Sequence, residues 1–228
     1  MTVSNEESPD VELDASTTVE TIKIAPTEWI KRLQSTWGEP LVVPEWEDDT
    51  EGYRAKNGWQ ANLVHDENAP VRITRYFVQY GNGNDISDDV SITRGGVGTI
   101  LTGVVVFTPR AESHQGYCHG GSMCSVMDDV VGWCSFLTTG RCQPWSGFTV
   151  QVNTSLRQPV AVNATLLVRA EISKIERRKV YMKAVLVDPA NEDRVHAICD
   201  GMAVLNCGVL PLETQQSTDT VGTEVDES

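Results

Sequence analysis

The sequence predicts an α+β fold in which an antiparallel sheet packs against one long buried helix. Residues 119–136, HGGSMCSVMDDVVGWCSF, form one long apolar stretch that is interrupted only by Asp128 and Asp129. Its apolar residues recur at helical spacing, whereas the segments on either side have the β-branched composition of strands. This order of elements is typical of a sheet that buries one face against a helix.

Six segments are predicted to be strands. Turn-forming residues separate them, including the loop GNGNDISDD and the turns KIERRK and DPANED. Because the last connections are short, an antiparallel meander after the helix is the simplest architecture. The predicted strands are residues 73–80, 99–107, 148–155, 164–172, 180–187 and 195–205.

Charge divides the 228 residues, with a net charge of −14, into a nearly neutral centre and two acidic ends. The first end carries six acids and the last carries five, and neither has a Lys or Arg, so we expect disordered tails. Within a Trp-rich arm, the segment TEWIKRLQSTW is predicted to form a helix capped by Thr27 that packs onto the main body. The predicted divisions are a tail at 1–22, the arm at 23–70, the main domain at 71–207 and a tail at 208–228.

Composition argues against several classes of protein. The centre lacks the concentrated basic surface that a nucleic-acid partner requires. There is no apolar run long enough to span a membrane, and the start MTVSNEESPD resembles neither a secretory nor a mitochondrial signal, so we expect a soluble cytoplasmic protein. None of the six cysteines is spaced as CxxC, so free buried thiols are expected and no metal site.

Two faces separate when residues 121–137 are placed on a helix at ~100° per residue. One face has the spacing of a core stripe. The other consists of small residues around Asp128, which permit close approach, so we expect a partner element or subunit to cover it and to leave Asp128 semi-buried. The core stripe is Met123, Val126, Met127, Val130, Val131, Cys134 and Leu137, and the small-residue face is Cys124, Ser125, Asp128, Gly132 and Ser135.

A semi-buried carboxylate costs roughly several kcal/mol unless it is hydrogen-bonded or has a task. One interpretation is that Asp128 and Asp129 hold neighbouring loops. The other depends on His119, Gly120 and Gly121, which place unpaired backbone N–H groups and the positive end of the helix dipole about two turns before Asp128. An anion-stabilising helix end and a carboxylate suit acyl transfer, provided that the substrate lies along the helix.

These residues resemble a known family. HGGSMCSVMDDVVGWC is similar to the HGG-x6-D helix of hotdog-fold acyl-CoA thioesterases, in the branch of the phenylacetate-pathway and thioesterase-superfamily enzymes. The likeness extends from about Arg72 to Leu205 and includes ESHQGYCHGG, a strand ending in LRQPV and the turn IERRKVYMKAVLVD. The resemblance implies a hotdog fold, with acyl-CoA sites between the subunits of a homodimer or of a dimer of dimers.

The resemblance also implies the catalytic residues. Asp128 would act as general base or nucleophile on the thioester carbonyl, the backbone N–H of Gly120 would form the oxyanion hole, and His119 would help to position the thioester. A hydroxyl that orients the attacking water or carboxylate is expected in the strand after the helix, and Thr149 matches it.

Thr149 lies in the segment FTVQVNTS, where strand alternation places it on a polar face with Gln151 and Asn153. A threonine in a strand is also simply a good β-former. Ser146 is a nearby alternative, because the loop TTGRCQPWSG is a few residues longer than in some relatives.

Substrate contacts are implied around the helix start and at basic residues. Relatives often place an asparagine six residues before the HGG histidine, whereas this chain has a Ser-His-Gln run there, any member of which could donate to the thioester. Three basic residues resemble positions that meet the phosphates of coenzyme A, although each would serve equally as a surface charge. The implied substrate-binding residues are Ser113, His114, Gln115, Gly121, Arg157, Arg178 and Lys179.

The predicted function is hydrolysis of an acyl-CoA thioester to a free acid and coenzyme A, without a metal or a cofactor besides the coenzyme A of the substrate. The alternative is a non-catalytic hotdog module that binds acyl-CoA or a protein, since the family's asparagine is missing and the tails are acidic. Hydration of an enoyl thioester ranks lower, because it would require a histidine base with the aspartate. The acyl group depends on a cavity that a sequence pattern does not measure.

Overall fold

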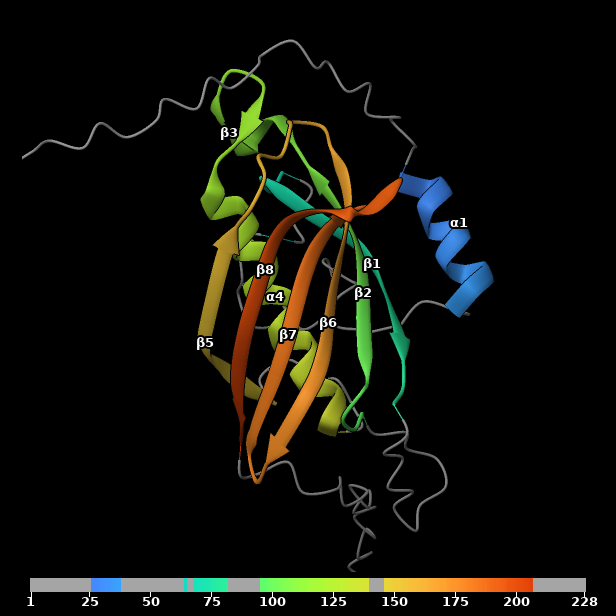
Figure 1. Ribbon diagram of the computed structural model, residues 1–228, viewed down its shortest axis with the longest axis vertical. Coiled ribbons are helices and arrows are strands. Elements are labelled where there is room, and N and C mark those ends of the chain that lie inside the picture. The colour runs from blue at the N-terminus through green and yellow to red at the C-terminus, as the bar shows by residue number, and fades with distance from the viewer. Residues whose placement is uncertain (1–25, 38–63, 65–67, 82–94, 140–145, 207–228) are drawn as a thin grey trace, which may run out of the picture.

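The computed structural model describes residues 26–37, 64, 68–81, 95–139 and 146–206 (Figure 1). Both predicted tails and most of the Trp-rich arm lie outside these residues. The described part contains a six-stranded antiparallel sheet that curves around one long helix, α4 (Gly120–Phe136). The strands are β1 (Val71–Gln79), β2 (Ile100–Phe107), β5 (Gly147–Leu156), β6 (Thr165–Glu176), β7 (Lys179–Asp188) and β8 (Asn191–Leu205).

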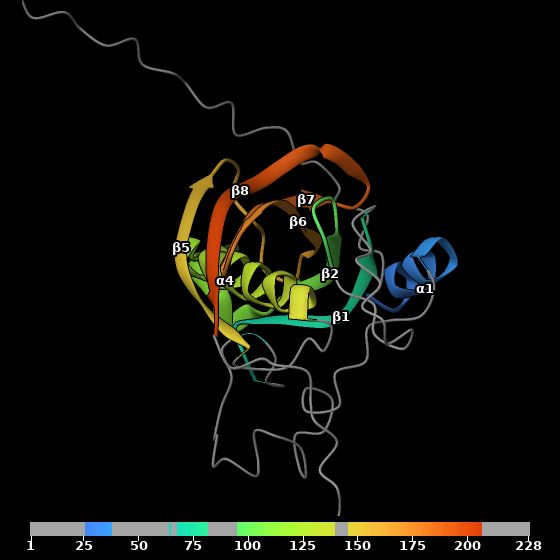
Figure 2. The same cartoon turned by 90° about the horizontal axis from the view of Figure 1, so that it is seen from below.

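Figure 2 shows α4 inside the curve of the sheet and a second helix, α1, on its outside. This arrangement confirms the predicted fold class, an antiparallel sheet wrapped around a central helix. The shorter described elements are α1 (Pro26–Trp37), β3 (Glu112–His114), β4 (Tyr117–Cys118) and the 3-10 helices η1 (Pro109–Ala111) and η2 (Leu137–Thr139).

The strand order corrects the predicted meander. The sheet runs β1-β2-β6-β7-β8-β5, so of the four sheet strands after α4 only β6, β7 and β8 follow one another in space as they do in sequence. After α4 the chain returns at the far edge, and β5 pairs with β8. Placing β5 there extends the curve of the sheet around the helix, a long-range arrangement that loop lengths alone do not determine.

The predicted core stripe of α4 is confirmed. All seven of its residues are buried against the inner face of the sheet, and five of them are completely inaccessible to solvent. The fit is close at Gly201 of β8, where an added Cβ would lie 2.6 Å from a methyl group of Val131. The helix can therefore lie against the sheet only because that strand position lacks a side chain.

Helix α1 begins at Pro26, one residue before the predicted cap Thr27. Its Trp29 and Leu33 are buried on the outer face of the sheet and form a second apolar cluster there. The sheet residues buried in that cluster are Phe77, Val104, Leu167 and Val187. For this part of the arm, the prediction that an indole packs onto the main body is confirmed.

The cysteines follow the sequence expectation in part. Cys118, Cys134 and Cys199 are buried and take part in no disulfide, and Cys124, which also takes part in none, is half-buried. The other two cysteines lie outside the described residues. Among the described residues, none of the helices could cross a membrane, and no cluster of three or more potential metal ligands occurs.

A buried histidine fastens the segment that supports the start of α4. The side chain of His196 on β8 is buried, and its Nδ1 donates to the carbonyl of Pro159 at 3.0 Å, while its own carbonyl accepts the N–H of Gln158 at 3.2 Å. The neighbouring carbonyl of Val160 accepts the N–H of Cys118, which directly precedes the first turn of α4. Burial lowers the pKa of His196, and the bond to Pro159 only partly opposes this.

The lowered pKa of His196 makes stability depend on pH. In the unfolded chain the imidazole binds a proton at pH ~6.5, whereas in the folded chain it is still neutral at that pH. The contribution of the neutral ring to the free energy of unfolding is therefore fully present above that pH and is lost as pH falls through the folded pKa. Between pH 8 and 5, the free energy of unfolding measured with denaturant should therefore decline, and the decline should be shallower in His196→Gln. Parallel curves for the two proteins would contradict this role.

Candidate active site

The first turn of α4 leaves one backbone N–H group available. His119 is the N-cap residue, and its Nδ1 accepts the N–H of Gly121 at 2.8 Å, while its carbonyl accepts the N–H of Ser122 at 3.0 Å. Among the described residues, no acceptor lies on the N–H of Gly120. The predicted set of free amides is thus reduced to Gly120, and the Nδ1 of His119 acts as an acceptor in the cap.

Asp128 projects from the side of α4 that faces β5, and its side chain is exposed in the single chain. Even so, burial by surrounding protein atoms raises the pKa of Asp128, a hydrogen bond from the Thr149 hydroxyl opposes that increase, and the charge of Asp129 adds to it. Eight residues separate Asp128 from Gly120, which corresponds to ~12 Å along the helix axis. The covering of Asp128 by a second subunit stays a prediction.

A β-bulge determines where Thr149 points. Thr149 pairs with Ala203 and Gln151 pairs with Met202, so Val150 is an extra residue in β5. Because Ala203 is completely buried on the inner face, its partner Thr149 also faces inward. The predicted polar face shared by Thr149 and Gln151 is therefore wrong, since a bulge interrupts strict alternation.

The bulge brings Thr149 to the small-residue face of α4. Its Oγ1 lies 3.5 Å from the position that a Cβ on Gly132 would occupy, one turn beyond Asp128. Gly132 thus permits the close approach that the sequence predicted for this face, and the covering element at this point is β5. The alternative hydroxyl, Ser146, is buried before β5, where its carbonyl accepts the N–H of Asn206 at 2.9 Å.

The second acid of the pair has a different partner. The hydroxyl of Tyr76 on β1 donates to Asp129 Oδ2 at 2.9 Å, and Tyr76 is 1% exposed. Gly103 on β2 makes room for the ring, because an added Cβ there would lie 2.6 Å from Tyr76 Cε1. Asp129 therefore ties α4 to the strand β1, a contact that no pattern in the sequence indicated.

The implied substrate-binding residues fall into two groups. Ser113, His114 and Gln115 are exposed in the β3–β4 hairpin, which leads into the start of α4. Arg157 is exposed just after β5, where Leu156 reaches the same helix end.

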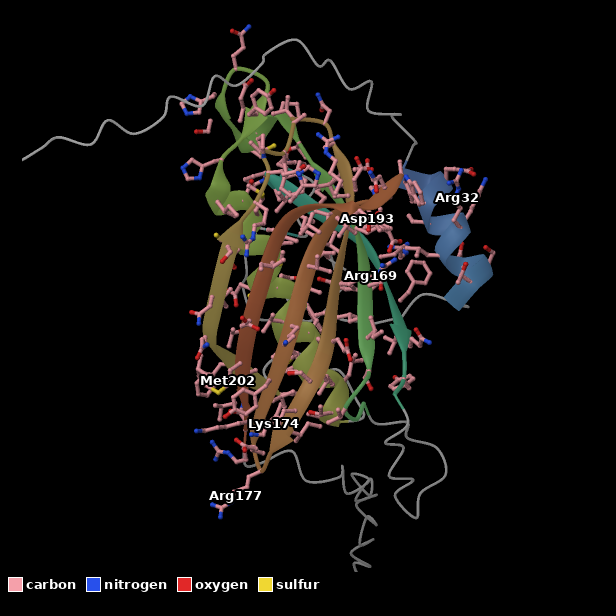
Figure 3. The ribbon with its side chains drawn as sticks, viewed as in Figure 1. Arg32, Arg169, Lys174, Arg177, Asp193 and Met202 are labelled. Carbon is pink, nitrogen blue, oxygen red and sulfur yellow. The ribbon has the colours of Figure 1, made fainter. Side chains whose placement is uncertain are left out.

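The second group lies at the other end of the sheet. Arg178 lies in the β6–β7 turn and Lys179 is the first residue of β7, and the neighbouring Arg177 is at the lower end of the molecule in Figure 3. Lys179 is level with Phe148 near the start of β5, because both pair with Val204. Within one chain, the structure does not bring this turn together with His119 and Gly120.

Sequence comparison supports the resemblance. Residues 115–193, which include the start of α4 and Asp128, match the model of the Thioesterase superfamily. The domain is similar to hotdog-fold acyl-CoA thioesterases.

The human protein named acyl-coenzyme A thioesterase THEM5 is 29% identical over 84 residues, which are 36% of this chain and 32% of that protein. Its mouse counterpart is 26% identical over 77 residues, or 34% and 29% of the two chains. The chain thus spans about a third of the length of these curated relatives.

Solved structures with a related arrangement include zebrafish thioesterase superfamily member 2, with a TM-score of 0.42, 16% identity and coverage of 50% of this chain and 80% of that one. The PaaI protein of the E. coli phenylacetic acid degradation operon has a TM-score of 0.41, 14% identity and coverage of 47% and 72%. The Streptococcus mutans protein smu.793 bound to acetyl CoA has a TM-score of 0.40, 15% identity and coverage of 46% and 81%.

The hydrogen bond from Thr149 has a measurable effect on Asp128. Thr149→Val removes the hydroxyl that stabilises the ionised carboxylate, so the pKa of Asp128 should rise further above its ordinary value. A carboxyl carbon NMR titration measures this directly. Thr149→Ser retains a hydroxyl and should leave the titration close to wild type, whereas an unchanged titration in Thr149→Val would show that the bond is not formed in solution.

Proposed function

We propose that the protein is an acyl-CoA thioesterase, a hydrolase that converts an acyl-CoA thioester to a free acid and coenzyme A. The observation that carries this proposal is that α4 bears both groups that the reaction needs. Its start has a free N–H at Gly120, and further along lies Asp128, whose pKa is raised and whose carboxylate accepts the Thr149 hydroxyl. The match to the Thioesterase superfamily over residues 115–193 supports it, as does the relative named acyl-coenzyme A thioesterase.

Each residue has a chemical role in the proposed reaction. The thioester carbonyl accepts the N–H of Gly120, which stabilises the oxyanion as it forms. Asp128 either takes a proton from the attacking water or attacks the carbonyl carbon itself, and Thr149 orients the carboxylate. In either route the C–S bond then breaks, and the thiolate of coenzyme A takes up a proton. After direct attack by Asp128, water hydrolyses the resulting acyl–aspartyl anhydride, which releases the free acid and restores the carboxylate. A carboxyl group with a raised pKa is a stronger base than an ordinary aspartate, which favours the first role.

The separation of the two groups favours a site that two subunits share. A carbonyl held at hydrogen-bond distance from Gly120 is out of reach of a carboxylate ~12 Å further along the same helix. The partner subunit's Asp128 would instead approach the helix start of this chain. The resemblance implies the same arrangement, and a homodimer or a dimer of dimers satisfies it.

The β5 edge is the proposed subunit contact. Phe148 and Val150 are 52% and 43% exposed along this edge strand, which carries apolar groups where edge strands usually carry charges. A two-fold axis pairs identical strands antiparallel. Such pairing places the β6–β7 turn of the partner subunit at the end of the sheet where α4 of this chain begins.

This geometry gives the two groups of substrate-binding residues a common ligand. Arg157 and the β3–β4 hairpin come from the subunit that supplies the helix start, whereas the basic β6–β7 turn comes from the other subunit. The phosphates of coenzyme A would lie between them, and the reaction needs no cofactor besides that coenzyme A. Location in the cytoplasm stays a prediction.

The two adjacent acids provide a matched test. Asp128→Asn should reduce release of free thiol from acyl-CoA by about 10²–10⁴-fold, because an amide cannot act as base or nucleophile. Thr149→Ala should lose less of this thiol-releasing activity. Asp129→Asn is the control: its amide oxygen still accepts the Tyr76 hydroxyl, so turnover at the optimum pH should stay near wild type.

The assay should use short, medium, long and aromatic acyl-CoAs, because the acyl group is unknown. Wild-type turnover in Asp128→Asn would refute the proposed mechanism. Binding of acyl-CoA without thiol release by the wild-type protein would favour the non-catalytic module, for which the absent family asparagine is the motivating observation.

The basic turn should affect binding and not chemistry. Replacement of both Arg178 and Lys179 by Ala should raise KM for acyl-CoA about tenfold, equivalent to ~1.4 kcal/mol, with kcat unchanged. The effect should disappear with the matching acyl-pantetheine, which lacks the nucleotide phosphates. Lys183→Ala, an exposed charge in the middle of β7, is the control. An equal KM rise with acyl-pantetheine would argue against phosphate contacts.

A further inference from the structure

Leu156, the last residue of β5, lies on the backbone of the first residue of α4. A Cβ built on Gly120 would be 2.6 Å from Leu156 Cδ1, so this methyl group occupies the space beside the glycine. Leu156 pairs with Ala197, which is completely buried on the inner face, and therefore faces the same side of the sheet. The inner face of one strand thus reaches both parts of the candidate site, with Thr149 at Asp128 and Leu156 at Gly120.

The exposure of Leu156 is informative in this position. The side chain is 48% exposed although its tip touches the helix start, and half-exposed Tyr117 precedes the same turn. A large apolar side chain that stays half exposed beside a free N–H group is available to contact an apolar part of a ligand bound there. The structure therefore places an apolar wall directly next to the amide.

The position of that wall follows from the geometry of a bound thioester. If the carbonyl oxygen accepts the N–H of Gly120 at about 2.9 Å, the carbonyl carbon lies roughly 4 Å from the amide nitrogen, with the acyl α-carbon and the sulfur attached to it. Leu156 Cδ1 is close enough to Gly120 to exclude a Cβ. When the acyl α-carbon, and not the sulfur, is turned towards Leu156, extra bulk on that carbon meets the leucine.

We propose that Leu156 is a specificity-determining residue that selects against acyl-CoA substrates branched at the α-carbon. This inference rests on the proposed thioesterase function and deepens it, because it assigns a class of preferred substrate, the unbranched acyl-CoAs. Leu156 takes no part in bond breaking. It limits the space beside the oxyanion-stabilising amide, so its truncation changes the choice of substrate and not the reaction.

The test compares two substrates that differ by branching. We would measure kcat/KM for straight-chain and 2-methyl-branched acyl-CoAs at the chain length that the wild-type enzyme hydrolyses fastest. Leu156→Ala should raise the ratio of branched to straight substrate about tenfold, since one methyl group in an apolar contact changes kcat/KM by that order. Ile198→Ala is the control, because Ile198 pairs with the neighbouring Ser155, is 37% exposed and faces the opposite side of the sheet.

The outcomes separate the two proposals. An unchanged ratio in Leu156→Ala, with both substrates hydrolysed, would overturn the role of Leu156 and leave the thioesterase function intact. Equal changes in Leu156→Ala and Ile198→Ala would overturn it as well. Absence of thiol release from every acyl-CoA by the wild-type protein would overturn the proposed function, and the inference with it.

The contact itself can be tested without turnover. Gly120→Ala should be more destabilising in the wild-type background than in the Leu156→Ala background, because truncation of the leucine frees the space for the new Cβ. Thermal unfolding of the two single variants and the double variant measures this coupling. Additive shifts in Tm would show that Leu156 does not lie on Gly120, which would overturn the inference independently of the assay.

Discussion

The burial of one apolar face of α4 in the concave side of the sheet is the constraint on which the rest of the structure depends. Val126, Val130 and Val131 are completely inaccessible, and the missing side chain of Gly201 lets the helix approach β8 closely. Once this face is fixed, the rotation of the helix about its axis is fixed too. Asp128 must then point towards β5, because it lies on the other side of the helix from the core stripe.

The two neighbouring acids illustrate how that rotation separates two roles. Asp129 points to β1 and accepts the hydroxyl of Tyr76, which reinforces the orientation of the helix. Asp128 points to β5, where burial raises its pKa against the hydrogen bond from Thr149. The charge of Asp129 adds to that increase, so the structural acid also contributes to the electrostatics of the candidate catalytic acid.

Strand β5 combines three properties that the proposed function requires. Its bulge turns Thr149 inward, its last residue reaches the start of α4, and within the described residues it forms an edge of the sheet with exposed apolar side chains. A single irregularity, the extra residue Val150, makes this combination compatible with the hydrogen-bonding register to β8. The site therefore depends as much on the edge of the sheet as on the helix.

The sequence alone determined the central helix, its buried stripe, the positions of the strands and the pair of acids, because these follow from local periodicity and from residue types that are costly to bury. The predicted tails and domain limits lie largely outside the described residues. Likewise, the roles of Asp128 and Gly120 came from a family resemblance and stand as proposals.

Tertiary structure alone decided the strand order, the inward turn of Thr149, the Tyr76–Asp129 bond and the contact of Leu156 with Gly120. Alternation predicts the face of a strand residue only until a bulge shifts it, and Val150 is such a bulge. The other features join residues far apart in the chain, so register and packing determine them, and local sequence carries no signal of either.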